Sequence, residues 1–355
     1  MATESYLVTG GCGLQGSHIV SQLLDAYPSA AIAVLSRNPT KNRFPRVTYH
    51  AGDVTQPSDV RRTLEASQPT VIFHCAGIIT VGRKVVSEAL LWSINLDGTR
   101  ILLEECVAVG GVKAFVFTSS ASVVQRVLLM DIFGGDETME LCEDGDKSAM
   151  PYSKSKAAAE RLTHSYDDSS GKGMRTTSLR PALIYGERDG DIIPRLMQIL
   201  RQGRQRIQVG PNTNQLSYTY AGNSATAHIL AAQKLLTSPE GVAGESFFIT
   251  NGGDPVAFWT FARAVWEAAG DRTKLEEVKV VGVNTALCFA WVAEWFDWGR
   301  GQVPLLSRMM VKMICSNRWF KIGKAREKLG WEPAVDWKEG VTKGVQWYLE
   351  NEARQ

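Results

Sequence analysis

The sequence has few cysteines, and their spacing excludes a metal site or a disulfide framework. Its 355 residues include only six, at Cys12, Cys75, Cys106, Cys142, Cys288 and Cys315, with no C-x-x-C pair and no histidine at metal-ligand spacing. A chain of this length can bury enough apolar surface to fold without such crosslinks. We therefore expect the cysteines to be small core residues of a protein from a reducing compartment.

A surplus of charge of one sign is also missing. The chain has 39 lysine and arginine residues against 37 aspartate and glutamate residues, a formal charge of +2. Binding to nucleic acid requires a strong basic surplus on part of the surface, so no nucleic-acid partner is expected. The balance is typical of a protein that acts on a small molecule.

Long hydrophobic runs are absent as well. The longest candidate, Val280 to Ala293, has 14 residues and contains Asn284, whereas a membrane-spanning helix needs about 20 apolar residues. The first five residues carry Glu4 and lack the basic region of a secretory signal. We therefore expect a cytoplasmic protein.

What the first half does contain is an alternation of short aliphatic runs with stretches of helical periodicity. This pattern predicts βαβ units and an α/β fold with a doubly wound parallel sheet. The expected strands cover residues 6–9, 31–35, 47–51, 70–75, 114–119 and 175–184, and the clearest helices cover 17–24, 87–109 and 152–166. Residues 125–150 interrupt the pattern with an acidic cluster, which we interpret as a surface insertion with solvated charges.

A glycine-rich loop, Thr9-Gly-Gly-Cys-Gly-Leu-Gln-Gly16, joins the first expected strand to the first helix. In this context glycines permit a tight turn, close approach of the backbone to a pyrophosphate and close helix packing, while the helix N-terminus attracts phosphate. The loop therefore predicts dinucleotide binding by Gly10, Gly13, Leu14, Gln15 and Gly16.

The ends of the next strands bear on which dinucleotide binds. Ser36-Arg37 stands where an acidic residue would bind the ribose hydroxyls of NAD, and a guanidinium there can pair with a 2′-phosphate. This favours NADP over NAD, although Arg37 could instead stack on adenine or point to solvent. Further cofactor contacts are expected from Asp53 and Val54, at the adenine, and from the small residues Ala76 and Gly77.

Tyr152 and Lys156 are the catalytic candidates. At i and i+4 near the start of a helix they share one face. A tyrosine with its ordinary pKa of about 10 is a poor base, and a neighbouring ammonium favours the phenolate. Thr118-Ser119-Ser120 adds hydroxyls at the carboxyl end of the fifth strand, the edge where ligands bind in such sheets.

Together these motifs resemble the extended short-chain dehydrogenases/reductases, and within them the 3β-hydroxysteroid dehydrogenases and decarboxylating sterol-4α-carboxylate 3-dehydrogenases. The resemblance covers nearly the whole chain, through TGGCGLQG, GDVT, HCAG, NLDGT, FTSSASV, PYSKSKAAAE, LRPALIYGERD and YAGNSATAHILA.

The resemblance implies a Rossmann fold and assigns roles to particular residues. Tyr152 would be the acid/base, Lys156 its activator and a ligand of the nicotinamide ribose, Ser120 the hydroxyl that orients the reacting oxygen, and Asn95 a support of the lysine. Pro181 to Ile184 would border the nicotinamide. Two stretches depart from the family pattern: Ser36, where members that use NAD usually have Asp, and residues 78–84, which differ from the expected Ser/Pro-containing turn.

The C-terminal part differs in composition. Nine of the ten tryptophans lie at or beyond Trp259, and eight basic residues face one acid between positions 299 and 328. We expect residues 1–185 and 217–250 to form an NAD(P)-binding domain, and residues 186–216 and 251–355 a smaller substrate-binding lobe. The Trp-rich, basic and helical segment 285–328 of that lobe suits a sterol or terpenoid substrate, and also peripheral contact with an endoplasmic reticulum membrane.

These observations predict an NAD(P)-dependent oxidoreductase that acts on a secondary alcohol or ketone of a sterol, steroid or terpenoid, with loss of CO2 where a neighbouring carboxylate is present. Two alternatives are a nucleotide-sugar epimerase or dehydratase and an NADP-binding redox sensor without catalysis. The sequence leaves the oligomeric state open, with a homodimer as one option.

Overall fold

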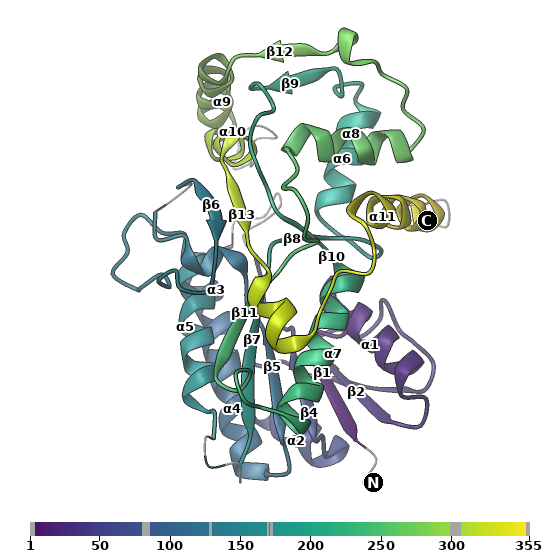
Figure 1. Ribbon diagram of the computed structural model, residues 1–355, viewed down its shortest axis with the longest axis vertical. Helices are drawn as coiled ribbons and strands as arrows, with labels where there is room; N and C mark the ends of the chain where they lie inside the picture. Colours follow the sequence, from purple (N-terminus) through teal and green to yellow (C-terminus); the bar gives the residue numbers. More distant parts are fainter. Residues whose placement is uncertain are drawn as a thin grey trace.

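The computed structural model describes residues 4–79, 86–127, 130–168, 170, 173–298 and 307–352. Its base is a seven-stranded parallel sheet with the strand order β11-β7-β5-β4-β1-β2-β3, which confirms the predicted doubly wound architecture (Figure 1). The strands are β1 (Ser5–Thr9), β2 (Ala31–Ser36), β3 (Val47–Ala51), β4 (Val71–His74), β5 (Ala114–Thr118), β7 (Arg175–Pro181) and β11 (Glu245–Ile249).

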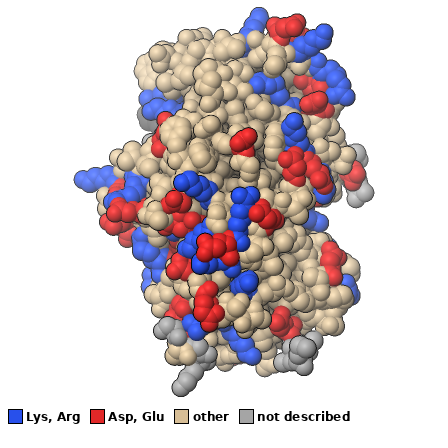
Figure 2. All heavy atoms as spheres, viewed as in Figure 1, with Lys and Arg blue, Asp and Glu red and all other residues tan. Residues whose placement is uncertain are grey.

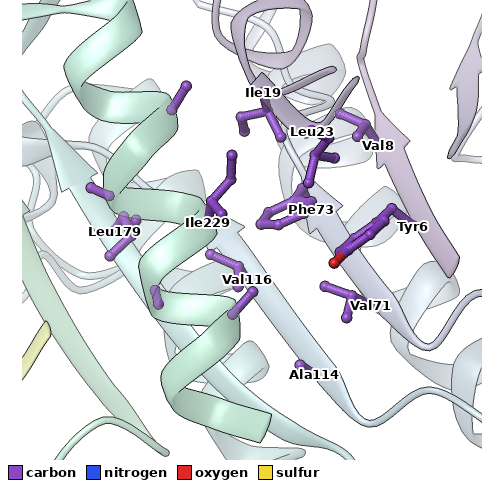
Figure 3. Close-up of a cluster of buried hydrophobic side chains, with 14 of the residues drawn as sticks. Tyr6, Val8, Ile19, Leu23, Val71, Phe73, Ala114, Val116, Leu179 and Ile229 are labelled. Atoms are coloured by element: carbon purple, nitrogen blue, oxygen red, sulfur yellow. The ribbon is translucent and has the colours of Figure 1, made fainter. Parts of the chain in front are cut away.

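Helices cover both faces of this sheet. One face packs against α1 (Leu14–Ala26) and α7 (Ala221–Thr237), and the other against α2 (Pro57–Ser67), α4 (Gly98–Val109) and α5 (Pro151–Ser165). Figure 3 shows the first of these two cores, where Ile229 of α7 and Leu23 of α1 meet Phe73 and Val116 of the sheet. Each such side chain contributes about 1.5–3 kcal/mol when it is fully buried.

The central strands are apolar on both sides because each side meets a helix layer. All four residues of β4 are buried, and the first four residues of β5 are buried too. Such strands appear in the sequence as continuous aliphatic and aromatic runs rather than as alternating patterns. The edge strand β3 has no buried residue, in keeping with its position.

The predicted crossover helix over 87–109 is present but contains an irregular turn. It consists of α3 (Glu88–Trp92), a π-helical turn (Ser93–Asp97) and α4. Single π-helical turns within α-helices occur frequently at functional sites. Here the turn carries Asn95, one of the predicted site residues.

The remaining elements build a second lobe beyond the carboxyl ends of the strands (Figure 1). It has its own core, in which Trp259, Phe261 and Trp266 pack with Tyr185 and Tyr218. Its elements are β8 (Leu183–Tyr185), α6 (Ile192–Arg201), β9 (Ile207–Val209), β10 (Tyr218–Tyr220), α8 (Phe258–Ala268), a 3-10 turn (Leu275–Glu277), β12 (Lys279–Val281), α9 (Val283–Trp298), α10 (Arg308–Cys315), β13 (Arg318–Phe320) and α11 (Trp337–Glu352). A π-helical turn (Ala325–Leu329) between β13 and α11 packs instead on the core of the sheet, against α7 and β11.

The insertion 125–150 is more ordered than a solvated loop. Its strand β6 (Ile132–Gly135) pairs with β13. Arg126 pairs with Glu140 and with Asp146, and the Glu137 carboxylate accepts a 2.8 Å hydrogen bond from the main-chain N–H of Phe248. The expectation of merely solvated charges was therefore wrong for these three acids. Glu140 and Asp146 bind an arginine of the same insertion, and Glu137 binds the main chain of β11.

The segment 285–328 is not one helix. It contains most of α9, then α10, β13 and part of a π-helical turn, while residues 299–306, including Arg300, lie outside the described residues. Most of its basic side chains form ion pairs: Arg308 with Glu294, Lys321 with Asp136, Lys324 with Glu245, Arg326 with Glu332, and Lys328 with Glu327. The predicted basic face is thus largely neutralised.

Candidate active site

The glycine-rich loop has the geometry that its sequence predicted. Gly10 has φ +69°, and a Cβ there would lie 2.8 Å from the main-chain nitrogen of Ala76. A Cβ on Gly16 would lie 2.5 Å from the Gly10 carbonyl oxygen, and Gly13 caps the N-terminus of α1. Side chains at Gly10 and Gly16 would therefore force the loop apart.

The loop also offers unused hydrogen-bonding groups to a cofactor. Both polar atoms of the Gln15 amide are buried and have no partner within the described chain. Such groups are costly unless something binds them. The first turn of α1 holds no acidic residue, so its N–H groups can bind an anion. The residues present therefore fit the pyrophosphate of a dinucleotide.

The segment expected to bind adenosine contains a second arginine, Arg43, in addition to the predicted Arg37. Ser36 is half-buried, and Arg37 is exposed beside it. Arg43 lies over the Tyr49 ring, 4.6 Å from its centroid. It also belongs to the charged surroundings of Cys12, whose pKa is raised by burial and lowered in part by a hydrogen bond from Ser36 and by Arg43. Arg43 is thus a second cation near Ser36. The sequence did not point to it, because it lies outside the Ser36-Arg37 motif.

Asp53 and Val54, the residues expected at the adenine, both use their side chains for contacts within the protein. One carboxylate oxygen of Asp53 accepts hydrogen bonds from the N–H and the hydroxyl of Thr55, both at 2.9 Å. The Val54 side chain is buried, and a Cβ on Gly98 would lie 2.9 Å from one of its methyl groups. The main chain of Val54 and the second oxygen of Asp53 are therefore the parts that can meet adenine.

Ala76, Gly77 and Asn95 meet beyond the end of β4. The Asn95 side chain accepts from the Ile78 N–H at 2.9 Å and donates to the Ile78 carbonyl at 3.1 Å and to the Ser155 hydroxyl at 3.1 Å. A Cβ on Gly77 would lie 3.1 Å from the Asn95 oxygen and 4.0 Å from Lys156 Nζ. Asn95 thus fixes the turn beside Lys156, and its hydrogen bonds go to that turn and to Ser155 rather than to the ammonium.

Tyr152 and Ser120 come together at the carboxyl end of β5. Burial raises the pKa of the Tyr152 phenol, and a hydrogen bond from the Ser120 side chain opposes that rise. Ser119 points elsewhere, because its hydroxyl donates to the buried carboxylate of Glu160. Of the two adjacent serines, Ser120 is therefore the one that contacts Tyr152 in the structure.

Lys156 reaches the same place from one turn further along α5. It is buried, its Nζ donates to the Thr118 carbonyl oxygen at 2.7 Å, and it lies 3.9 Å from the centroid of the Phe117 ring. Burial lowers the pKa of Lys156 to about 7, so protonation of this amine is finely balanced near neutral pH.

Pro181 and Ile184 lie where the chain passes from the sheet into the second lobe. Pro181 is buried at the end of β7, and Ile184 is half-buried in β8, opposite Thr219 of β10. The break between β7 and β8 falls at Ala182, whose N–H donates to the Thr219 hydroxyl at 3.0 Å. The pattern of the sequence predicts one continuous strand over residues 175–184, which the structure divides at Ala182.

Two buried polar clusters behind the site were missed. In the first, His74 lies 2.6 Å from the Thr9 hydroxyl and 2.9 Å from the Thr99 hydroxyl. In the second, Arg180 binds Glu160 through hydrogen bonds as short as 2.6 Å. Both clusters join residues that are far apart in sequence, so no motif indicates them. The one local sign of them is the presence of polar residues in otherwise apolar strands and helix faces.

The arrangement supports proton transfer next to a dinucleotide. A phenol, a serine hydroxyl and an ammonium converge at the carboxyl edge of the sheet, where the loop after β1 fits the cofactor phosphates. Among the described residues no group of three or more His, Cys, Asp or Glu side chains could hold a metal ion.

Comparison with known proteins agrees with this geometry. Residues 7–279 match the model of the 3-beta hydroxysteroid dehydrogenase/isomerase family. The chain is 34% identical to a decarboxylating sterol-4-alpha-carboxylate 3-dehydrogenase from Saccharomyces cerevisiae, with 97% of each protein covered. It is 31% identical to a 3-beta-hydroxysteroid dehydrogenase from Mycolicibacterium neoaurum, with 97% of this chain and 91% of that protein covered.

Solved structures share the fold. UDP-glucose 4-epimerase from Thermotoga maritima superimposes with a TM-score of 0.74 at 22% identity, with 98% of this chain and 99% of that chain covered. A dTDP-glucose 4,6-dehydratase from Bacillus anthracis in complex with NAD gives a TM-score of 0.72 at 18% identity, with 99% and 98% covered. The chain therefore belongs to the 3-beta hydroxysteroid dehydrogenase/isomerase family and is a nicotinamide-dependent oxidoreductase of the short-chain dehydrogenase type.

Proposed function

We propose that this enzyme oxidises the 3-hydroxyl group of a sterol that carries a carboxylate on the neighbouring carbon, and that CO2 is then lost. The observation that carries the proposal is the convergence of Ser120, Tyr152 and Lys156 at the sheet edge. The substrate class rests on the whole-length similarity to a protein named for sterol-4-alpha-carboxylate oxidation.

In the proposed mechanism Ser120 and Tyr152 bind the reacting hydroxyl. The Ser120 hydroxyl, which contacts Tyr152, holds the substrate oxygen against the phenol. The phenolate of Tyr152 takes the hydroxyl proton, and the ammonium of Lys156 favours that phenolate electrostatically. A nicotinamide cofactor held by the glycine-rich loop would supply the acceptor for the hydride. We assign Lys156 a second role, donation to the cofactor ribose, which its position near Gly77 and the end of β5 supports.

Loss of CO2 needs no further catalytic side chain. Once the alcohol has become a ketone, a carboxylate on the adjacent carbon leaves as CO2 and its electron pair forms an enolate delocalised onto the ketone oxygen. Ser120 and Tyr152 already face that oxygen and can stabilise the charge and return a proton.

We further propose NADP as the preferred cofactor. Ser36 brings no carboxylate toward a 2′-phosphate, and both Arg37 and Arg43 lie in the segment that follows it. A guanidinium forms charge-assisted pairs with phosphate. Arg43 strengthens the proposal because it neighbours Cys12 of the glycine-rich loop.

We assign substrate binding to residues 186–216 and 251–355, and membrane contact to α9. Ala286 and Ala290 of α9 are buried, whereas Phe289, Trp291 and Trp295 are 66%, 58% and 68% exposed. Figure 2 shows a broad uncharged area over α9. No helix in the described part of the chain is long and apolar enough to cross a membrane. Exposed aromatic side chains of this kind suit the interface of a bilayer, through which a sterol would be drawn.

An epimerase or dehydratase acting on nucleotide sugars is the competing assignment, because such enzymes share the fold. The experiment is to incubate the purified protein with NADP or NAD and a panel of sterol alcohols, 3-hydroxy-4-carboxy sterols and nucleotide sugars, and to identify products by mass spectrometry. We expect a ketone that lacks one CO2 from the carboxy sterol. Turnover of the nucleotide sugars alone would overturn the proposal, and binding of cofactor without any turnover would favour a redox sensor.

A further inference from the structure

Lys156 depends on one main-chain group for its position. Within the described part of the chain, the Thr118 carbonyl oxygen is the acceptor of its hydrogen bond, at 2.7 Å. The titratable groups that interact with the ammonium are His74 and Cys75 at the end of β4 and Glu160 on α5, and Tyr152 stands one turn earlier on the same helix. The placement of Lys156 is therefore sensitive to the orientation of the peptide that follows Thr118.

The side chain of Thr118 is bound on the opposite face of the sheet. Its hydroxyl oxygen lies 2.8 Å from Nε2 of His228, which belongs to α7. Phe117, the preceding residue of β5, faces α5 and carries Lys156 over its ring. Alternation along the strand thus sends the Thr118 side chain toward α7 while its carbonyl meets Lys156.

The hydrogen bonds of His228 determine its tautomer. Nδ1 lies 2.7 Å from the main-chain oxygen of Ser224, one turn earlier in α7. A carbonyl oxygen only accepts, so Nδ1 carries the proton. Burial lowers the pKa of His228 to about 4, which keeps the ring neutral. Nε2 is then an acceptor, and the Thr118 hydroxyl donates to it.

Cys75 completes this arrangement. Its Sγ lies 3.1 Å from the Thr118 hydroxyl oxygen. The hydroxyl has one proton, and because sulfur is a weak acceptor that proton goes to His228, while the contact with Cys75 holds the Thr118 side chain on its other side. Burial raises the pKa of Cys75 to about 12, and the thiol keeps its proton at neutral pH. The end of β5 is thus held between β4 and α7 by these contacts.

We infer that His228 is a positioning residue for the reaction: from behind the sheet it orients Thr118, and through the Thr118 carbonyl it places Lys156 against Tyr152. This inference rests on the proposed function of Tyr152 and Lys156. It assigns a role to a fully buried residue that is 110 positions from Thr118 in sequence.

The test compares His228→Leu, which removes the acceptor, with His228→Gln, whose amide oxygen can replace Nε2. When the Thr118 peptide turns away, the ammonium loses its acceptor and stabilises the phenolate less. We expect His228→Leu to lower kcat about tenfold, because small misplacements of catalytic groups are costly. The acidic limb of the kcat/KM profile should move to higher pH, since the Tyr152 phenolate then forms less readily. Thr118→Val should show the same changes, whereas His228→Gln and Thr118→Ser should recover most of the activity.

Two measurements do not depend on turnover. Fluorescence titration should show weaker NADPH binding by His228→Leu than by the wild type, because Lys156 is displaced from the ribose. NMR of protein labelled with 15N in histidine should show His228 as the neutral Nδ1-protonated tautomer from pH 5 to pH 9. Leu235→Ala, a truncation in the core face of the same helix, controls for loss of stability and should leave the pH profile unchanged.

The outcomes separate the inference from the proposed function. If Tyr152→Phe is inactive while His228→Leu keeps the wild-type kcat, pH profile and NADPH affinity, the positioning role is wrong and the proposed chemistry stands. If Tyr152→Phe stays active, the proposed chemistry fails, and NADPH affinity and the NMR tautomer still decide whether His228 orients Thr118.

Discussion

At the residue scale, cofactor choice depends on the few side chains that follow β2. Ser36 ends the strand, Arg37 is exposed directly after it, and Arg43 lies nearby beside Tyr49 and Cys12. A 2′-phosphate placed here would meet two guanidinium groups and no carboxylate from Ser36. Both arginines are therefore expected to contribute to selectivity, with Arg37 nearer in sequence to the strand end.

We predict that Arg37→Ala weakens NADPH binding about tenfold, and NADH binding less than twofold, because one charge-assisted hydrogen bond contributes about 1.5–3 kcal/mol and only NADPH has the phosphate. Fluorescence titration with both cofactors measures this. Arg43→Ala should act in the same direction, and Arg46→Ala, on the same loop, serves as the control. Equal losses for the two cofactors would remove the basis for the NADP preference.

The residues that sequence alone could identify are those whose chemistry is local. Gly10, Gly16, Tyr152 and Lys156 lie in short motifs whose spacing already implies their geometry. Ser120 was distinguished from Ser119 by the family resemblance alone, because both are hydroxyls at the end of the same strand; in the structure Ser119 binds Glu160 and Ser120 contacts Tyr152. His228 could not be found at all, because its partner Thr118 is 110 positions away and only the folded sheet brings them together.

At the element scale, α5 carries most of the site and is fastened to the sheet by a buried ion pair. Glu160 and Arg180 of β7 are 1% and 4% exposed, and Glu160 also accepts hydrogen bonds from Ser119 and Ser246. This ties the helix of Tyr152 and Lys156 to the strand that ends at Pro181. The crossover helix is likewise attached to the site by a buried polar side chain. Its π-helical turn, which no sequence pattern indicated, carries Asn95, and Asn95 binds the turn after β4.

We predict that Glu160→Gln lowers the free energy of unfolding by about 3–5 kcal/mol, because it leaves the Arg180 charge buried and uncompensated. The exposed pair of Glu339 and Lys343 on α11 provides the control, and Glu339→Gln should cost less than about 1 kcal/mol. Denaturant unfolding of the three proteins checks both values. A loss below about 1 kcal/mol for Glu160→Gln would show that the pair does not fasten α5.

The same pair predicts a dependence on pH. Burial alone would raise the pKa of Glu160, but the charge and hydrogen bonds of Arg180 bring it below the ordinary glutamate value of 4.5. The unfolded chain therefore binds a proton more readily than the folded one, so this stabilisation is present above about pH 4.5 and is lost as the pH falls through the lower folded value. Thermal melts at decreasing pH should show a steeper loss for the wild type than for Glu160→Gln.

At the scale of the whole molecule, a parallel sheet with a cofactor site joins a second lobe that bears an exposed aromatic helix (Figure 1). The alternation of strands and helices made the sheet predictable. The second lobe was less so: its buried tryptophans, Trp259 and Trp266, form core, whereas Trp291 and Trp295 of α9 are exposed. Trp331, also in the C-terminal part of the sequence, is buried in the core of the sheet instead. Composition could not distinguish buried from exposed tryptophans, because both kinds occur in the same apolar C-terminal stretches of the sequence.

We predict that the wild-type protein binds phosphatidylcholine vesicles through α9, and that the double variant Trp291→Ser with Trp295→Ser binds at least about fivefold more weakly, because buried apolar area drives such binding. Binding should persist at about 0.5 M salt, since most nearby basic side chains are already paired with carboxylates. Vesicle flotation measures both. Val107→Ser with Val109→Ser, on α4, is the control, and equal flotation of the α9 variant and the wild type would contradict the assignment.

The central claim is that Tyr152 exchanges the proton of the reacting oxygen while the cofactor exchanges the hydride. Its most direct test compares Tyr152→Phe with Tyr166→Phe, which removes the same hydroxyl at the other end of α5, by measuring turnover and NADPH affinity. We predict that Tyr152→Phe lowers kcat by about 10²–10⁴-fold with NADPH affinity within about twofold of the wild type, whereas Tyr166→Phe keeps both. A Tyr152→Phe enzyme that retains more than about a tenth of wild-type turnover would contradict the account.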